Sequence, residues 1–228
     1  MKIEVTASKE GYADGYKSIT LSGCGDLECC QSEDCFICEE DCKCGANEIC
    51  DPLSSYRNQE TLCSPKVAYI FISNDPDLGA AQRLKMLPRI NSIRKYYQSL
   101  GYKTSTVYVD DISGVARYLS RLSTKAIAYF GHATQPSIEH SPPLDIQNYI
   151  LQQFRKNYGA KYPDLKEEIK NKAGERAAHP DLDYAYMFTC HSLDDTSLRD
   201  YLLHSGGTYW GDNGKLYGLW WLQKSVKP

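Results

Sequence analysis

The chain has 228 residues, of which 42% are hydrophobic, enough for one medium-sized domain with a packed core and a small additional module. Its net charge of −3 argues against a general nucleic-acid binder, because phosphate binding needs a basic face. The apolar run VAYIFI has the length of a strand and falls far short of the ~20 residues of a membrane helix, so no membrane-spanning segment is expected.

The N-terminal part, residues 1–23, is predicted to be an extended arm or the end of a preceding domain. KIEVTAS alternates as a strand does, and the first residues lack the apolar centre of a signal peptide. We therefore interpret the chain as part of a larger secreted or surface polypeptide.

A cysteine-rich module is predicted at residues 24–66, which hold nine of the ten cysteines. So short a segment cannot bury a useful core and needs covalent links or metal. A disulfide framework is our first interpretation, and it indicates an oxidising, extracellular or cell-surface location. Nine is an odd number, and Cys30 is expected to stay unpaired because it breaks the spacing. The disulfide candidates are Cys24, Cys29, Cys35, Cys38, Cys42, Cys44, Cys50 and Cys63.

Two other chemistries stay open for this module. Cys35 and Cys38 have zinc-ligand spacing. The acidic side chains, nine against one lysine between Cys24 and Asp51, offer oxygen ligands for calcium. No cofactor is expected for the chain, and calcium is the one possibility that stays open. The segment also resembles a small cysteine-rich repeat of prokaryotic surface proteins, with departures at Leu27 and Cys30.

The rest of the chain, residues 67–228, alternates between strands and helices. Apolar, aromatic and β-branched runs predict the strands. Helices of this length between strands indicate a parallel sheet covered on both faces. Pro88 is expected to break or restart the first helix, and Asp111 to cap the second. The strands are expected at 67–73, 103–109, 125–130, 183–189 and 208–213, and the helices at 78–101, 111–122, 144–158, 163–177, 194–206 and 216–224.

Two strands in succession end on reactive side chains. His132 follows AIAYFG, and Cys190 follows YAYMFT. Ligands of open parallel sheets bind beyond the carboxyl ends of the strands. If the two strands are neighbours, the imidazole can take the proton of the thiol, whose thiolate attacks. The plainer alternative is a small buried cysteine and a loop histidine.

The other histidines are weaker candidates for the base. His191 is adjacent to Cys190 on an extended chain and is expected to point to the opposite face. His140 and His179 fall in predicted loops, and His204 falls near the C-terminus of a predicted helix.

AIAYFGHAT followed by YAYMFTCHSLDDTSLRDYLLHSGGTYWGDNG resembles the caspase-like superfamily of cysteine peptidases, with the secreted gingipain-like branch fitting best. The resemblance covers about residues 67–222. It implies an α/β, caspase-like three-layer sandwich with a mainly parallel central sheet. It further implies that Cys190 is the nucleophile, that His132 is the general base and acid, and that the backbone N–H groups of Cys190 and Ala133 form the oxyanion hole.

The expected function is therefore a secreted or surface cysteine endopeptidase acting on a protein or peptide substrate. The family usually has glycine where this chain has Ala133, which serves only if its φ is negative. The caspase signature Q-A-C-x-G is absent, so aspartate specificity is not implied.

Related peptidases that select basic residues place an acidic side chain in the specificity pocket. Asp75 is the favoured candidate here and Asp212 a further one, although turn or cap roles fit all of these acids. The other acids considered are Asp77, Asp194 and Asp195. Two alternatives to the peptidase stay open, a non-catalytic binding module with the same fold and a metal-binding surface protein.

Overall fold

The computed structural model describes residues 2–7, 15–20, 35, 41–75, 80–131, 137–163, 167–190, 192, 194 and 196–211 of the chain. None of the helices in these ranges combines the length and the apolar character needed to cross a lipid bilayer.

The predicted N-terminal arm contains a β-hairpin. β1 (Lys2–Ala7) pairs antiparallel with β2 (Gly15–Thr20), and Lys2 lies opposite Thr20. A second short antiparallel pair, β3 (Glu48–Cys50) and β4 (Cys63–Pro65), belongs to the cysteine-rich module.

A parallel sheet forms the centre of the described structure, with its five strands in the order β6-β5-β7-β8-β9. The chain runs from β5 out to β6 and then returns to β7 on the other side of β5. The strand order therefore switches between β5 and β7, the place where open parallel sheets bind ligands. The α/β class predicted from the sequence is confirmed. The strands are β5 (Val67–Ser73), β6 (Lys103–Val109), β7 (Thr124–Phe130), β8 (Leu182–Phe188) and β9 (Leu203–Trp210).

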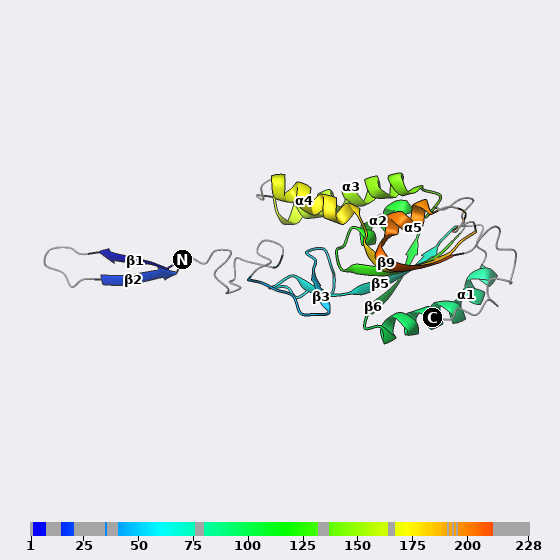
Figure 1. Cartoon of the computed structure of the whole chain (residues 1–228), viewed down its shortest axis with the longest axis horizontal. Coiled ribbons are helices and arrows are strands. Elements are labelled where there is room, and N and C mark those ends of the chain that lie inside the picture. The colour runs from blue at the N-terminus through cyan, green and yellow to red at the C-terminus, as the bar shows by residue number, and fades with distance from the viewer. Residues whose placement is uncertain are drawn as a thin grey trace.

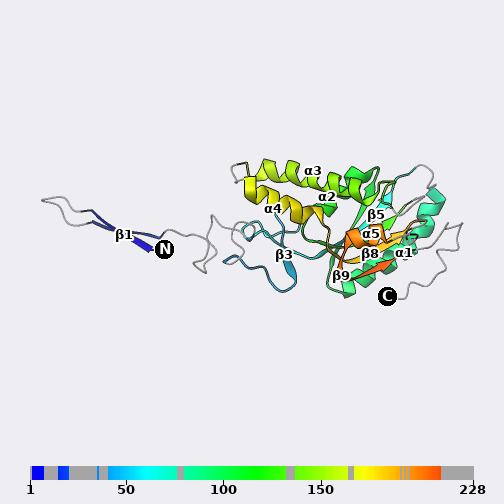
Figure 2. The ribbon, with the colours of Figure 1, turned by 45° about the horizontal axis from the view of Figure 1, so that its top comes forward.

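Helices cover both faces of this sheet, which gives the three layers visible in Figures 1 and 2. One helix, α1, packs on one face, while α2, α3 and α5 pack on the other and α4 lies against α3. The alternation of a strand decides which side chain enters which layer. Tyr69 and Phe71 face α2, whereas Ile70 faces α1. The helices are α1 (Ala80–Ser99), α2 (Ile112–Leu119), α3 (Pro143–Lys161), α4 (Glu167–Ala178) and α5 (Ser197–Leu202).

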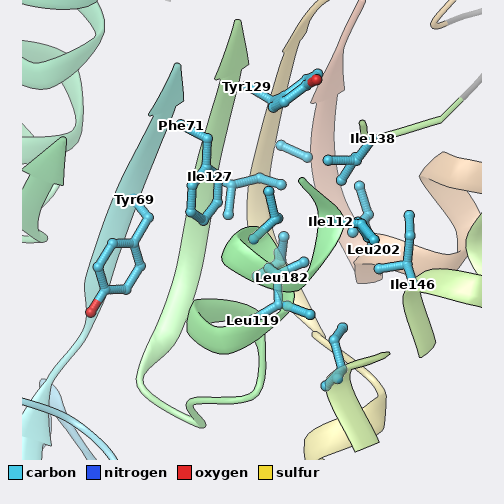
Figure 3. Close-up of a cluster of buried hydrophobic side chains, with 14 of the residues drawn as sticks. Tyr69, Phe71, Ile112, Leu119, Ile127, Tyr129, Ile138, Ile146, Leu182 and Leu202 are labelled. Carbon is cyan, nitrogen blue, oxygen red and sulfur yellow. The ribbon is translucent and has the colours of Figure 1, made fainter. Parts of the chain in front are cut away.

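Two buried tyrosines in the larger core point their hydroxyl groups to opposite edges of the sheet (Figure 3). The Tyr129 hydroxyl reaches the carboxyl edge and donates to Glu139 Oε1 at 3.0 Å. The Tyr69 hydroxyl lies toward the amino edge and accepts from Arg121 Nη1 at 2.7 Å. Burying each ring contributes about 1.5–3 kcal/mol, and the hydroxyl needs a partner because it is taken out of water.

Local structure agrees with the sequence at α2 and differs at α1 and α5. Asp111 caps α2, accepting from the Gly114 amide at 2.9 Å as expected. Pro88 lies inside a continuous α1, on an exposed part of the helix where water can satisfy the carbonyl that it leaves unbonded. The last helix, α5, ends at Leu202, so His204 belongs to β9 and not to a helix C-terminus.

The cysteine-rich module is disulfide-bonded in its described part. Cys35 bonds Cys50, and Cys44 bonds Cys63. Cys42 is disulfide-bonded as well. The disulfide interpretation is confirmed for these five cysteines. Cys24, Cys29, Cys30 and Cys38 lie outside the described residues.

One carboxylate of the module is buried against the α/β domain. Asp51, which is 0% exposed, accepts through Oδ2 from the amide of Ser123 at 2.8 Å and from its hydroxyl. Its Oδ1 accepts from the Leu53 amide at 2.9 Å. Ser123 precedes β7, and its carbonyl accepts from the Val67 amide that begins β5. Asp51 therefore ties the module to the amino ends of the two central strands.

Candidate active site

The two strands expected to carry the dyad are neighbours in the sheet. β7 and β8 are parallel, and Phe130 is the register partner of Phe188. Just beyond the strands, the Gly131 amide donates to the Phe188 carbonyl at 3.3 Å. The two strands therefore end at the same level of the carboxyl edge.

Cys190 lies directly beyond β8, following the buried Thr189. It is half-buried and takes part in no disulfide among the described residues, in contrast to the five described cysteines of the module. The turn that follows it is tied to β9, since the Tyr209 hydroxyl donates to the Ser192 carbonyl at 3.0 Å. The structure thus holds a thiol at the strand end where the sequence predicts a nucleophile.

The other residues predicted for the dyad and the oxyanion hole lie outside the described residues. These are His132 and Ala133, and the decoy His191 lies outside them too. The approach of the imidazole to the Cys190 thiol therefore stays a prediction.

Asp75 follows β5 at the point where the strand order switches. It is half-buried, its amide donates to Ser73 Oγ at 3.2 Å, and its Oδ2 lies 4.0 Å from Nε2 of His140. The structure thus brings Asp75 and His140 together at the carboxyl edge. Asp194 is exposed in the turn after Cys190, while Asp77, Asp195 and Asp212 lie outside the described residues.

Glu139 lies at the same edge and was not anticipated from the sequence. Two hydrogen bonds connect it to Tyr129, because the Glu139 amide also donates to the Tyr129 hydroxyl, at 3.2 Å. Burial raises the pKa of the Glu139 carboxyl, while its hydrogen bonds with Ser73 and Tyr129 lower it. Burial and the nearby carboxylate raise the pKa of Tyr129. The site therefore contains a carboxyl group that accepts a proton more readily than an ordinary glutamate does.

The turn that carries Glu139 has an unusual backbone. Glu139 and His140 have φ values of 47° and 60°, and they are enclosed by reciprocal hydrogen bonds between Ile138 and Ser141. Asn-Gly is the preferred pair for two such left-handed residues, and other side chains cost free energy. No local sequence signal announces a Glu-His pair in this turn, so the sequence did not single out Glu139, while His140 lies in a turn as predicted.

Glycine is required at the end of β7. A Cβ atom at Gly131 would lie 2.3 Å from the Tyr129 hydroxyl, which is already bonded to Glu139. The glycine that precedes His132 therefore lets the chain pass over the Tyr129–Glu139 pair.

Aromatic side chains pack on the α1 side of the sheet at the carboxyl ends of β7 and β8. The rings of Phe130 and Phe188 stack at 4.4 Å, and the guanidinium of Arg89 lies 5.5 Å from the Phe188 ring centroid. Stacking and a cation–π contact of this kind fix the ends of β7 and β8 relative to each other.

No family model, curated protein or solved structure matches the chain. The arguments for function therefore depend on the residues and their geometry. Chemically, the carboxyl edge offers a thiol at the end of β8, and at the switch in strand order it offers two carboxyl groups, an imidazole and two hydroxyl groups.

Proposed function

We propose that the chain is a cysteine endopeptidase of the caspase-like kind, with Cys190 as nucleophile and His132 as general base and acid. The main support is the register of the two neighbouring parallel strands. Phe130 pairs with Phe188, 58 residues further on, and the same 58 residues separate His132 from Cys190. Adjacent parallel strands are about 5 Å apart, close enough for a side chain of one to meet a side chain of the other.

The proposed reaction proceeds in two steps. The His132 imidazole takes the thiol proton, and the Cys190 sulfur attacks the carbonyl carbon of the scissile peptide bond. The C–N bond breaks, the imidazolium gives its proton to the leaving amine, and a thioester remains on Cys190. Water then attacks the thioester with His132 as base, which releases the carboxylic acid and restores the thiol.

The backbone N–H groups of Cys190 and Ala133 are proposed to stabilise the oxyanion of each tetrahedral intermediate. A substrate side chain with positive charge is proposed to be selected by Asp75, with Asp212 as a further candidate. The disulfides of the module suit a secreted or surface location, since such bonds persist in oxidising compartments.

The deciding experiment is active-site labelling with peptidyl acyloxymethyl ketones, one with lysine and one with aspartate in the position that precedes the scissile bond. We expect the lysine compound to alkylate Cys190 at neutral pH, with the adduct located by mass spectrometry of the tryptic peptides. Cys190→Ser and His132→Ala should abolish the adduct. His204→Gln, a histidine change at the amino edge, is the matched control and should label normally.

The outcome identifies which interpretation holds. No adduct on Cys190 from either compound, or equal labelling with His132→Ala, supports a non-catalytic binding module and contradicts the peptidase. Labelling by the aspartate compound alone keeps the peptidase but overturns the role proposed for Asp75.

A further inference from the structure

A cavity of about 240 Å³ opens at the amino edge of the sheet, the edge opposite to Cys190. It lies where the module meets the α/β domain, between β3, the end of α2, the start of β7 and the turn from α4 to β8. Its apolar wall consists of Ile49, Leu119, Leu122, Ala177 and Pro180.

The polar lining of this cavity is predominantly cationic. Arg121, Lys125 and Arg176 are positively charged at neutral pH, and Asp181 is the one carboxylate among the lining residues. His179 adds a further charge when it is protonated. An excess of two positive charges beside an apolar wall favours an anionic ligand.

Two of these cations are already positioned. The Arg121 guanidinium donates to the Tyr69 hydroxyl at 2.7 Å and lies 4.6 Å from the Tyr118 ring centroid. Lys125 Nζ lies 3.1 Å from Asp181 Oδ2, but this carboxylate is 60% exposed and solvent weakens the pair.

Arg176 differs from these two cations. Within the described part of the chain, no hydrogen bond or ion pair engages its side chain, which is exposed at the end of α4. A guanidinium presents a planar fork of donors that matches a phosphate or carboxylate, so Arg176 can meet a ligand without giving up a protein partner.

We propose that this cavity binds a small organic oxyanion, a phosphate ester or carboxylate attached to an apolar group. The charged head lies between Arg176 and Arg121, and the apolar group lies against Ile49 and Leu122. Because Ile49 belongs to the module, the site requires that the module stays docked on the domain. The proposal is independent of the peptidase chemistry at the carboxyl edge.

The test is an NMR titration of the ¹⁵N-labelled protein at low ionic strength with phenyl phosphate, inorganic phosphate and phenol. We expect phenyl phosphate to shift the amide signals of the lining residues and to bind more tightly than either of the other two. Arg176→Ala should weaken its binding about tenfold, which is about 1.4 kcal/mol.

Arg155→Ala is the matched control, since Arg155 is exposed on α3 and does not line the cavity. It should leave the affinity for phenyl phosphate unchanged. Absence of shifts at the lining residues, or an equal loss with Arg155→Ala, overturns the proposal. Equal affinity for phenol and phenyl phosphate also overturns it, because the cations would then contribute nothing.

Discussion

The two edges of the central sheet bury carboxyl groups in opposite ways. At the amino edge, Asp51 is fully buried and meets three donors, so its charge is satisfied and it connects two parts of the fold. At the carboxyl edge, Glu139 is partly buried on a turn with two left-handed residues, and burial raises its pKa. Satisfied burial is typical of a structural joint, whereas strain and a perturbed carboxyl are typical of functional sites.

The largest expected effect tests whether the carboxyl edge is catalytic. Cys190→Ser and His132→Ala should each lower peptide hydrolysis by at least roughly 10²–10⁴-fold, because they remove the thiolate or the group that forms it. Their melting temperatures should stay close to that of the wild type. Hydrolysis of a fluorogenic lysyl peptide and thermal unfolding measure the two quantities.

A different pattern would show that this edge is only structural. Cys190→Ser would then place a polar hydroxyl at a half-buried position and cost up to about 1–3 kcal/mol of stability, and the wild-type protein would have no hydrolysis to lose.

The next effect tests whether the amino edge holds the module and the domain together. Removing the Cys44–Cys63 bond by Cys44→Ala with Cys63→Ala should cost about 2–4 kcal/mol. Only Lys66 separates β4 from β5, so the loss should reach the α/β domain. Urea unfolding monitored by near-UV circular dichroism measures this loss of stability.

The sequence alone predicts another outcome, in which mild reduction unfolds the module and leaves the domain intact. An unchanged unfolding transition of the α/β domain in this double variant would support that simpler expectation.

Asp51→Asn isolates the contact between the two parts. The asparagine side chain has the same size but only one acceptor oxygen, so its NH2 group must face the amide of Ser123 or that of Leu53, both of which are donors. One buried amide then loses its acceptor, which should cost about 1–3 kcal/mol of stability. Glu60→Gln is the matched control, because Glu60 is an exposed acid of the same module. The free energies of unfolding of the two variants, measured in urea, should differ by that amount. Equal values would show that Asp51 does not hold the module on the domain.

The smallest effect concerns the pH dependence caused by Glu139. Its pKa in the folded protein is raised above the ordinary 4.5, so its contribution to stability is complete below about pH 4.5 and is lost as the pH rises through the folded pKa. Glu139→Gln should remove that loss, so its stability relative to the wild type should be greater at pH 7 than at pH 4.

The expected change is small, because solvent reaches part of the carboxyl. Urea unfolding at both pH values measures it, with the exposed Glu175→Gln as control. A wild type whose stability relative to Glu139→Gln is the same at both pH values would contradict the raised pKa.

The central strands and most helices were predictable because their signals are local. VAYIFIS and KTSTVYV match β5 and β6 residue for residue, since runs of apolar and β-branched residues have few alternatives. The predicted end of the helix at Gly206 was wrong. LLHSG fits a helix that stops at glycine, whereas pairing with Leu182 makes Leu203 the start of β9.

Distant partners explain what the sequence could not show. In the sequence, Asp51 is only one of nine acids in the module, and its partner Ser123 is 72 residues away. The Glu139–Tyr129 pair depends on a strained turn without a sequence signature. The position of Cys190 beyond a strand followed from the apolar run before it, whereas the adjacency of β7 and β8 was only a condition in the sequence and comes from the structure.

The register shift in β9 affects how copies of this protein meet at high concentration. Leu182 pairs with Leu203 and Tyr184 with Thr208, so one residue of β8 faces four residues of β9. His204 to Gly207 thus contain three more residues than the facing stretch of β8, and they interrupt the row of backbone groups along β9, which ends the sheet on this side within the described part of the chain. A second molecule therefore finds no continuous template along β9, and the register shift disfavours edge-to-edge pairing at this strand.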